Sequence, residues 1–221
     1  IIFIISKKKM MIKNYFYSDR FYKNLIKKKK DPRIIKEYKK LLKYKKMIKF
    51  VYQNVPKGTG DAVLKTKRFI TDKYFLMLLP DDLIIKKNCS KSMINVHQKY
   101  KSSVMASMQV NKSTVSRWGI YNLTKRLSKS DYLISDVVEK PSIKDAPSNK
   151  AVIGRYILPK TIFKKLKNQN SGKGGEIHIT DAIQSLIKDN ENFIAHNFSG
   201  KYLDCGTMNG YINSGKKINN L

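Results

Sequence analysis

Short apolar runs and amphipathic stretches follow one another along the chain, and this alternation predicts strands and helices in turn. Residues 1–5, Ile-Ile-Phe-Ile-Ile, form a run typical of fully buried parallel strands, and residues 7–16 can form a helix. Apolar residues spaced three and four apart then predict two basic helices at 21–30 and 33–46, separated by Asp31-Pro32. The chain therefore begins as a β-α unit followed by two helices that face solvent.

The same alternation continues to the C-terminus. Residues 74–79, Tyr-Phe-Leu-Met-Leu-Leu, are the clearest candidate for a buried strand, and segments 119–123 and 132–138 suggest an antiparallel pair. Further strands are expected at 48–53, 103–110, 151–158, 193–198 and 201–203, of which the last two close the sheet, and further helices at 61–69, 90–100, 161–166, 179–188 and 205–217. This order predicts an α/β three-layer domain with a mostly parallel mixed sheet, spanning residues 1–221 as one domain.

Length and cysteine content narrow the class of protein. The chain has 221 residues and 41% hydrophobic content, enough for one substantial core. It has no run of roughly 18 apolar residues, which a membrane helix needs, and its first apolar run is followed rather than preceded by lysines, unlike a signal peptide. Cys89 and Cys205 show neither a disulfide pattern nor a zinc pattern. We expect a cytoplasmic protein that does not bind membranes.

The charge is strongly positive, with 46 Lys and Arg against 16 Asp and Glu. Clustered lysines would indicate a nucleic-acid or other polyanion surface. Runs at 7–9, 27–30 and 164–165 are instead spread along the chain, and the excess of Asn and Ile is typical of AT-rich coding sequence. We therefore expect no specific nucleic-acid partner, and keep a basic nucleic-acid-binding protein as an alternative.

A glycine-containing loop, Gln53-Asn-Val-Pro-Lys-Gly-Thr-Gly-Asp61, falls at a predicted strand-to-helix junction. Exposed backbone N–H groups at such a junction suit an anionic or base-like ligand. Gln53 offers paired donor and acceptor groups, and Gly58 allows backbone to approach a flat ring. An ordinary βα turn is the alternative interpretation.

Acidic residues follow two predicted strands. Asp81 and Asp82 come directly after the run at 74–79, and carboxylates at the end of a buried strand must be solvated, paired or metal-bound. Magnesium is the natural hard cation for such a pair. Asp204 follows another short strand and would supply a second carboxylate if the fold brings it beside Asp81. A solvated turn remains the alternative.

Other segments carry weaker signals. Lys140 in Glu139-Lys-Pro141 could act as a point charge for phosphate, or form an ordinary surface ion pair with Glu139. Residues 171–175 predict a mobile Gly-rich loop or a flexible connector, with Glu176 or Thr180 placed to cap the following helix. The three histidines, His97, His178 and His196, show no metal-ligand spacing. No Ser/His/Asp arrangement is visible either, so hydrolase chemistry has little support.

Taken in order, the motifs closely resemble bacterial UTP:glucose-1-phosphate uridylyltransferases over essentially the whole chain. Individual motifs are weak, but Val138-Glu-Lys-Pro141 followed by Ala146-Pro-Ser-Asn149 and Gly154-Arg-Tyr156 is specific to this branch of nucleotidyltransferases. The other segments are Phe50-Val-Tyr-Gln53, Gly58-Thr-Gly-Asp-Ala-Val63, Leu79-Pro-Asp-Asp82, Trp118-Gly119, Gly175-Glu-Ile177, Thr180-Asp-Ala-Ile183 and Asp204-Cys-Gly206.

The resemblance implies a Rossmann-like fold of the nucleotide-diphospho-sugar transferase type, in which Gln53 and Gly58 bind the uracil edge. It implies that Asp81 binds Mg²⁺, with Asp204 as the second ligand. Lys140, Asp81 and Glu139 form the implied catalytic set. The implied substrate-binding residues beyond the uracil loop, with Lys140 on the sugar phosphate, are Asp82, Gly119, Glu139, Lys140 and Gly154.

The implied reaction is in-line attack of a glucose-1-phosphate oxygen on the α-phosphorus of UTP, which releases pyrophosphate and forms UDP-glucose. Such a transfer requires the protein mainly to position the two substrates and to neutralise charge at the reacting phosphorus. The family begins with a strand and a Gly-rich loop that these residues do not contain, since residues 1–6 correspond to its second strand. We therefore expect the family's pocket with little activity in these residues alone, and a homo-oligomer. A thymidylyltransferase acting on the same sugar phosphate is the alternative enzyme.

Overall fold

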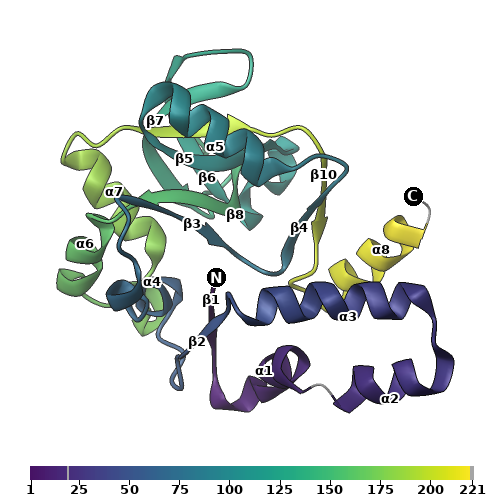
Figure 1. The fold of residues 1–221 in the computed structure, drawn as a ribbon. Helices are drawn as coiled ribbons and strands as arrows, with labels where there is room; N and C mark the ends of the chain where they lie inside the picture. The colour runs from purple at the N-terminus through teal and green to yellow at the C-terminus, as the bar shows by residue number, and fades with distance from the viewer. Residues whose placement is uncertain (19, 220–221) are drawn as a thin grey trace. The chain divides into compact units, whose positions relative to one another are not determined.

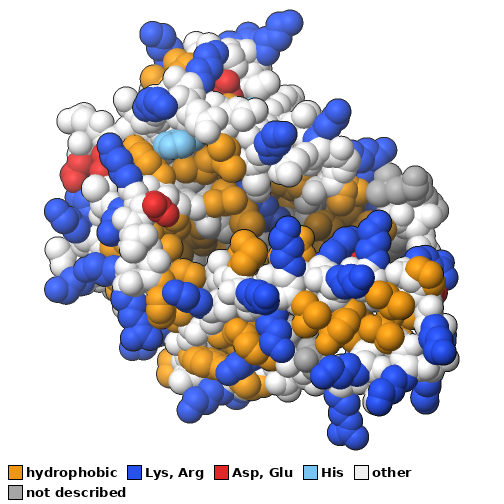
Figure 2. Space-filling model, in the orientation of Figure 1, with side chains coloured by type: hydrophobic (Ala, Val, Ile, Leu, Met, Phe, Trp, Pro, Cys, Tyr) orange, Lys and Arg blue, Asp and Glu red, His pale blue; other side chains and the backbone are white. Residues whose placement is uncertain are grey.

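A computed structural model describes residues 1–18 and 20–219, and the chain divides into two compact units. Unit 1 consists of residues 1–69 and 169–179, and unit 2 of residues 70–168 and 180 onward (Figure 1). Within the described residues, no helix has the length and apolar character needed to span a bilayer. Lys and Arg side chains are scattered over elements of both units (Figure 2).

Unit 1 begins with the expected β-α arrangement. Strand β1 (Ile2–Ile5) pairs in parallel with β2 (Lys49–Tyr52), and a chain of helices connects them. The connecting helices are η1 (Lys7–Lys9), α1 (Met10–Tyr17), α2 (Arg20–Lys29) and α3 (Pro32–Lys45). Helix α3 begins where the Asp31 carboxylate accepts a hydrogen bond from the Arg33 backbone N–H, at 2.8 Å. The two predicted basic helices are confirmed.

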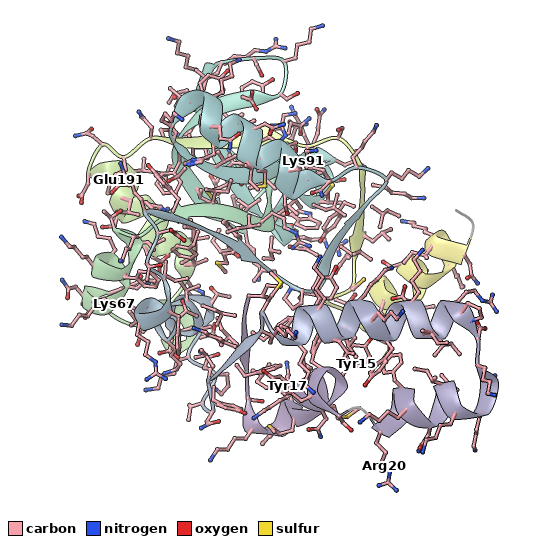
Figure 3. All side chains as sticks on the ribbon, viewed as in Figure 1. Tyr15, Tyr17, Arg20, Lys67, Lys91 and Glu191 are labelled. Atoms are coloured by element: carbon pink, nitrogen blue, oxygen red, sulfur yellow. The ribbon has the colours of Figure 1, made fainter. Side chains whose placement is uncertain are left out.

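The core of unit 1 is aromatic. The Phe3 ring stacks on Phe16 and on Phe50, with centroids 5.2 and 5.7 Å apart. The Tyr17 hydroxyl donates to the Ile48 carbonyl at 3.1 Å, and Tyr17 extends from α1, as Figure 3 shows. Buried aliphatic residues complete this core: Ile5, Leu41, Ile48 and Val51.

The remainder of unit 1 is a loop region with short helices. Helix α4 (Thr59–Leu64) and η2 (Lys67–Phe69) occupy the segment for which a helix was expected at 61–69. The Gly-rich segment contains η4 (Lys173–Gly175), and α7 (Ile179–Lys188) begins four residues later.

Unit 2 is built on a six-stranded sheet with the order β3-β8-β5-β9-β7-β6. These strands are β3 (Tyr74–Leu78), β8 (Lys150–Pro159), β5 (Ser103–Gln109), β9 (Phe193–Asn197), β7 (Asp131–Glu139) and β6 (Gly119–Arg126). The expected antiparallel pairing of the segments at 119–123 and 132–138 is confirmed, because β6 and β7 form a hairpin.

The prediction of a mostly parallel sheet is wrong for unit 2, although the mixed α/β fold is confirmed. In the described part of the six-stranded sheet, β5 and β9 are parallel and the other neighbouring pairs are antiparallel. The physical reason is that β8 lies between β3 and β5 and runs against both. Hydrophobic periodicity indicates where strands lie but carries no information on their direction.

Two further expectations about strands are wrong. Strand β3 was expected to be buried but is partly exposed, because it lies at the edge of the sheet beside β8. Leu76 is 38% exposed to solvent and Leu78 is 48% exposed. The segment 201–203 does not close this sheet: β10 (Lys201–Asp204) pairs antiparallel with β4 (Asp82–Ile85) in a separate two-stranded sheet. That pairing aligns Asp204 with Asp82.

Helices cover the sheet and complete the core of unit 2. Helix α5 (Cys89–Tyr100) packs against β5 and β8 through Met93 and Val96, and the cluster includes Val104, Ile153 and Ile194. The other helices of this unit are η3 (Lys112–Arg117), α6 (Ile162–Asn168), α7 from residue 180 onward and α8 (Met208–Asn219). Burial raises the pKa of the Cys89 thiol to about 11, and both cysteines are free, as expected.

Candidate active site

The loop between β2 and α4 is fixed by backbone hydrogen bonds to the segment that follows η4. The Gly60 N–H donates to the Ile177 carbonyl at 2.7 Å, and the Ile177 N–H donates to the Lys57 carbonyl at 2.8 Å. Gly58 has φ +91°, and a Cβ at this position would lie 2.5 Å from the Ile177 carbonyl oxygen. We call residues 53–61 with Glu176 to Ile179 the Gly58 loop, and only glycine fits at its centre.

Gln53 is tied to this loop by its own amide. Its Nε2 donates to the Gly58 carbonyl at 3.1 Å and to Asp61 Oδ2 at 2.7 Å. Asp61 is buried, and its other carboxylate oxygen lies 3.4 Å from the Lys65 ammonium. The structure therefore brings Gln53 and Gly58 together, as expected, but with the Gln53 nitrogen already engaged within the protein.

Thr59 and Asp61 lie in the first turn of α4, and no specific role was predicted for either of them. The Thr59 hydroxyl accepts from the backbone N–H of Ile179, the first residue of α7, at 3.3 Å. This cap comes from a segment 120 residues away. Thr180 and Glu176 were the expected caps, and only the presence of Thr59 in the Gly-Thr-Gly-Asp motif could have pointed to it.

In unit 2, Asp81 and Asp204 face a common point. A Cβ built on Gly206 would lie 3.1 Å from Asp81 Oδ2 and 3.3 Å from Asp204 Oδ1, so the two carboxylates flank the same small space. The Cys205 N–H donates to the Asp81 carbonyl at 2.8 Å, and the Gly206 N–H donates to Asp204 Oδ1 at 2.9 Å. The expectation that the fold would bring Asp204 beside Asp81 is confirmed.

This pair fits a hard divalent cation with few protein ligands. Among the described residues, no group of three or more His, Cys, Asp or Glu side chains could hold a metal by itself. Magnesium is commonly held by one or two carboxylates, with substrate phosphates and waters completing its coordination. Asp81 and Asp204 match that requirement, and the Asp81 side chain is exposed.

Asp82 has a different environment from its neighbour Asp81. Its Oδ2 accepts from the Gly154 N–H at 2.6 Å, its Oδ1 accepts from the Tyr202 hydroxyl, and its carbonyl accepts from Arg155. Burial and the bond to Asp82 raise the pKa of Tyr202 above its ordinary value, so its hydroxyl stays a donor at neutral pH. Both Asp82 carboxylate oxygens are therefore used within the protein.

Gly154 is required by the same arrangement. A Cβ at this position would lie 2.6 Å from the Leu79 side chain and would press on Asp82. The Gly154 carbonyl accepts from the Leu79 N–H and from Arg155 Nη1, both at 2.8 Å. We call Asp81, Asp82, Gly154, Tyr202 and Asp204 the carboxylate corner.

Gly119, Glu139 and Lys140 form a third group, at the end of the β6–β7 hairpin. Gly119 pairs with Glu139, and a Gly119 Cβ would lie 3.1 Å from Glu139 Oε2. Lys140 has the left-handed φ of +47°, and its N–H donates to the Trp118 carbonyl at 3.0 Å. Its ammonium lies 3.9 Å from Glu139 Oε1, and both side chains are more than half exposed. Such a pair contributes little stability and leaves both groups available to a ligand.

A hydrogen-bonded Ser/His/Asp arrangement exists in unit 2, although no such arrangement is visible in the sequence. His196 Nδ1 lies 2.7 Å from Asp131 Oδ1, and His196 Nε2 lies 3.0 Å from Ser92 Oγ. The Ser92 hydroxyl also lies 2.8 Å from the Cys89 carbonyl in its own helix. These contacts tie α5 to β9 and β7, three elements whose proximity no local pattern encodes.

Comparison with known proteins identifies the family. A sequence model of the nucleotidyl transferase family matches residues 4–220. A Pseudomonas aeruginosa UTP–glucose-1-phosphate uridylyltransferase is 39% identical over 166 residues, which cover 74% of this chain and 59% of that protein. A Methanocaldococcus jannaschii relative assigned to the same enzyme group is 35% identical over 223 residues, covering 99% of this chain and 76% of the relative.

Solved structures agree with these relatives. A UDP-glucose pyrophosphorylase crystallised with UDP-glucose superposes with a TM-score of 0.82 at 33% identity, covering 99% of this chain and 81% of that chain. Members of the family generally use a divalent metal. The chain belongs to the nucleotidyl transferase family, in its group of UTP–glucose-1-phosphate uridylyltransferases.

Proposed function

We propose that the protein to which this chain belongs transfers a uridylyl group from UTP to glucose-1-phosphate, forming UDP-glucose and pyrophosphate. The observation that carries the proposal is the pair of carboxylates, Asp81 and Asp204, aimed at one point. No nucleophilic side chain is needed, because the sugar phosphate oxygen attacks the α-phosphorus directly. The protein's task is to position two polyanions and offset their charge.

Within this proposal, Asp81 and Asp204 hold Mg²⁺. A magnesium ion there would neutralise charge on the phosphates of UTP. Asp81 is exposed, while Asp204 is held by the Gly206 N–H, which keeps its carboxylate in one orientation. Asp82 acts as a positioning residue, since its bonds to Gly154 and Tyr202 fix the turn that carries Asp81.

The other two groups would recognise the ends of the substrates. Gln53 and Gly58 contact the uracil edge, Glu139 accepts hydrogen bonds from glucose hydroxyls, and Lys140 contacts the sugar phosphate. Gly119 leaves room for the sugar beside Glu139, because any side chain there would press on the Glu139 carboxylate. The exposed Lys140 and Glu139 side chains are free to make these contacts.

The test is a product assay on the full-length protein with UTP, glucose-1-phosphate and magnesium. We expect equimolar UDP-glucose and pyrophosphate, no product with EDTA, and recovery when magnesium is restored in excess. Faster turnover with dTTP than with UTP would instead indicate a thymidylyltransferase. Absence of product with every nucleotide, together with tight and salt-dependent binding to nucleic acid, would favour the basic binding protein.

A further inference from the structure

The side-chain amide of Gln53 is held in one orientation. An amide nitrogen carries two hydrogens, and here one is donated to Asp61 Oδ2 at 2.7 Å and the other to the Gly58 carbonyl at 3.1 Å. Within the described part of the chain, no hydrogen bond engages Gln53 Oε1. The group that Gln53 leaves available to a ligand is therefore a pure acceptor.

Asp61 and the Gly58 carbonyl together prevent this amide from turning over. An ionised carboxylate accepts hydrogen bonds and cannot donate them, and the Gly58 carbonyl has the same restriction. Rotating the amide by half a turn would place Oε1 against both of these oxygens and would leave them without a donor. Asp61 is only 8% exposed, so water cannot easily replace the lost bond.

The orientation matters because pyrimidines differ at one ring atom. Uracil and thymine present an N3–H donor, whereas cytosine presents N3 as an acceptor. We propose that Asp61 is a positioning residue that selects uracil-type bases over cytosine, by presenting Gln53 Oε1 and withholding Gln53 Nε2. This inference rests on the proposed function, which assigns Gln53 to the base. It also predicts that Asp61 does not distinguish uracil from thymine.

The decisive variant is Asp61→Asn in the full-length protein, because Asn can donate or accept and so removes the stronger of the two acceptor-only partners that hold the Gln53 amide. We expect the ratio of kcat/KM for UTP to that for CTP to fall about tenfold or more, the scale of one misplaced hydrogen bond. The ratio for UTP to dTTP should stay unchanged, since both carry N3–H. If Asp61 had a purely structural role, the variant would lower kcat/KM for UTP, CTP and dTTP by the same factor.

Two further variants serve as controls for Asp61→Asn. Asp61→Glu keeps an acceptor-only side chain and should retain the preference for UTP, whereas Asp31→Asn makes the same chemical change at the N-cap of α3 in unit 1 and should alter neither ratio. If Asp61→Asn does not fold, the pair Asp61→Glu and Asp61→Gln makes the same comparison, with the loss expected for Gln alone.

Calorimetric titration with UTP and CTP gives the same ratio without turnover and separates this inference from the proposed function. Failure of the wild-type protein to form UDP-glucose would overturn the proposed reaction, while a binding ratio that falls in Asp61→Asn would still support the role of Asp61. An unchanged ratio of UTP to CTP in a folded Asp61→Asn variant would overturn the inference.

Discussion

The Gly58 loop and the carboxylate corner both contain an acid whose hydrogen bonds are spent inside the protein. In the loop, Asp61 holds the amide of Gln53 and leaves one neutral acceptor free. In the corner, Asp82 holds Gly154 and Tyr202, while its neighbours Asp81 and Asp204 keep their charge directed at a shared point. In both regions, the groups available to a ligand are those left over after the internal hydrogen bonds are made.

The two regions differ in what holds them together. Backbone groups bind backbone groups in the Gly58 loop, so the positions of Lys57, Gly60 and Ile177 do not depend on their side chains. In the carboxylate corner, the side chains of Asp82 and Tyr202 make contacts in addition to the backbone hydrogen bonds. We therefore expect the loop to be sensitive to changes in backbone conformation, and the corner to changes in side-chain chemistry.

The largest expected effect is that of Asp81→Asn. Removing one of two metal-ligand charges should lower turnover roughly a thousandfold, because the metal supplies several kcal/mol of charge stabilisation. The free energy of unfolding should change by less than about 0.5 kcal/mol, since Asp81 is exposed. Steady-state kinetics at varied magnesium and urea unfolding measure the two quantities.

The control for Asp81→Asn is Asp72→Asn, the same change at another exposed position of unit 2. It should leave turnover and its magnesium dependence as they are. If the Asp81→Asn protein kept an unaltered magnesium response, Asp81 would not be a metal ligand. The carboxylate corner would then not act through the charge of Asp81.

Gly58→Ala tests the backbone half of the comparison. The conformation at φ +91° and the Cβ contact 2.5 Å from Ile177 should together cost about 3 kcal/mol of unfolding free energy. Gly175→Ala is the matched control, since Gly175 also has a positive φ, +72°, but an added Cβ meets nothing within 4 Å. That variant should lose only about 1 kcal/mol.

Equal losses in Gly58→Ala and Gly175→Ala would show that backbone strain alone matters and that the contact with Ile177 does not. In Gly58→Ala we also expect a raised KM for UTP, because the loop that presents Gln53 must open to admit the methyl group. Urea unfolding and initial rates at varied UTP concentration distinguish the two effects.

Tyr202→Phe should have an intermediate effect, in the carboxylate corner. It removes the hydroxyl that donates to Asp82 and leaves a half-buried carboxylate oxygen without that partner, which costs about 2 kcal/mol. Tyr211→Phe, at a tyrosine that is 66% exposed on α8, is the control and should be neutral. A neutral Tyr202→Phe would mean that Asp82 does not need this bond to hold the turn.

Local patterns predicted most element positions, because strands and helices reflect the spacing of apolar residues over a few turns. They could not predict strand direction: β8 runs against both β3 and β5, and only the pairing of distant segments decides this. They also predicted that β3 is fully buried, whereas its position at the edge of the sheet leaves it partly exposed. Pairing and position in a sheet are tertiary properties, so the sequence pattern alone leaves them open.

For the candidate site, the order of motifs singled out the right residues but not their partners. Asp204 lies beside Asp81 because β10 pairs with β4, which joins segments more than a hundred residues apart. The bond of Asp82 to Tyr202 arises in the same way, between residues 120 positions apart, whereas the bond of Gln53 to Asp61 depends on how the short loop between them folds. A motif can name a carboxylate, but only the structure shows which of its oxygens remains available.

The smallest expected effect is that of Lys65→Ala, which separates charge from hydrogen bonding at Asp61. The Lys65 ammonium lies 3.4 Å from Asp61 Oδ1, one helical turn away, and its side chain is 37% exposed. Such pairs contribute about 0.3–0.5 kcal/mol, so the free energy of unfolding should barely change.

The Gln53 amide donates to the other oxygen of Asp61, Oδ2, and this hydrogen bond is kept in the Lys65→Ala protein. The preference for UTP over CTP should therefore persist. If that preference fell as far in Lys65→Ala as in Asp61→Asn, the charge balance around Asp61, rather than its hydrogen bond, would set the orientation of Gln53.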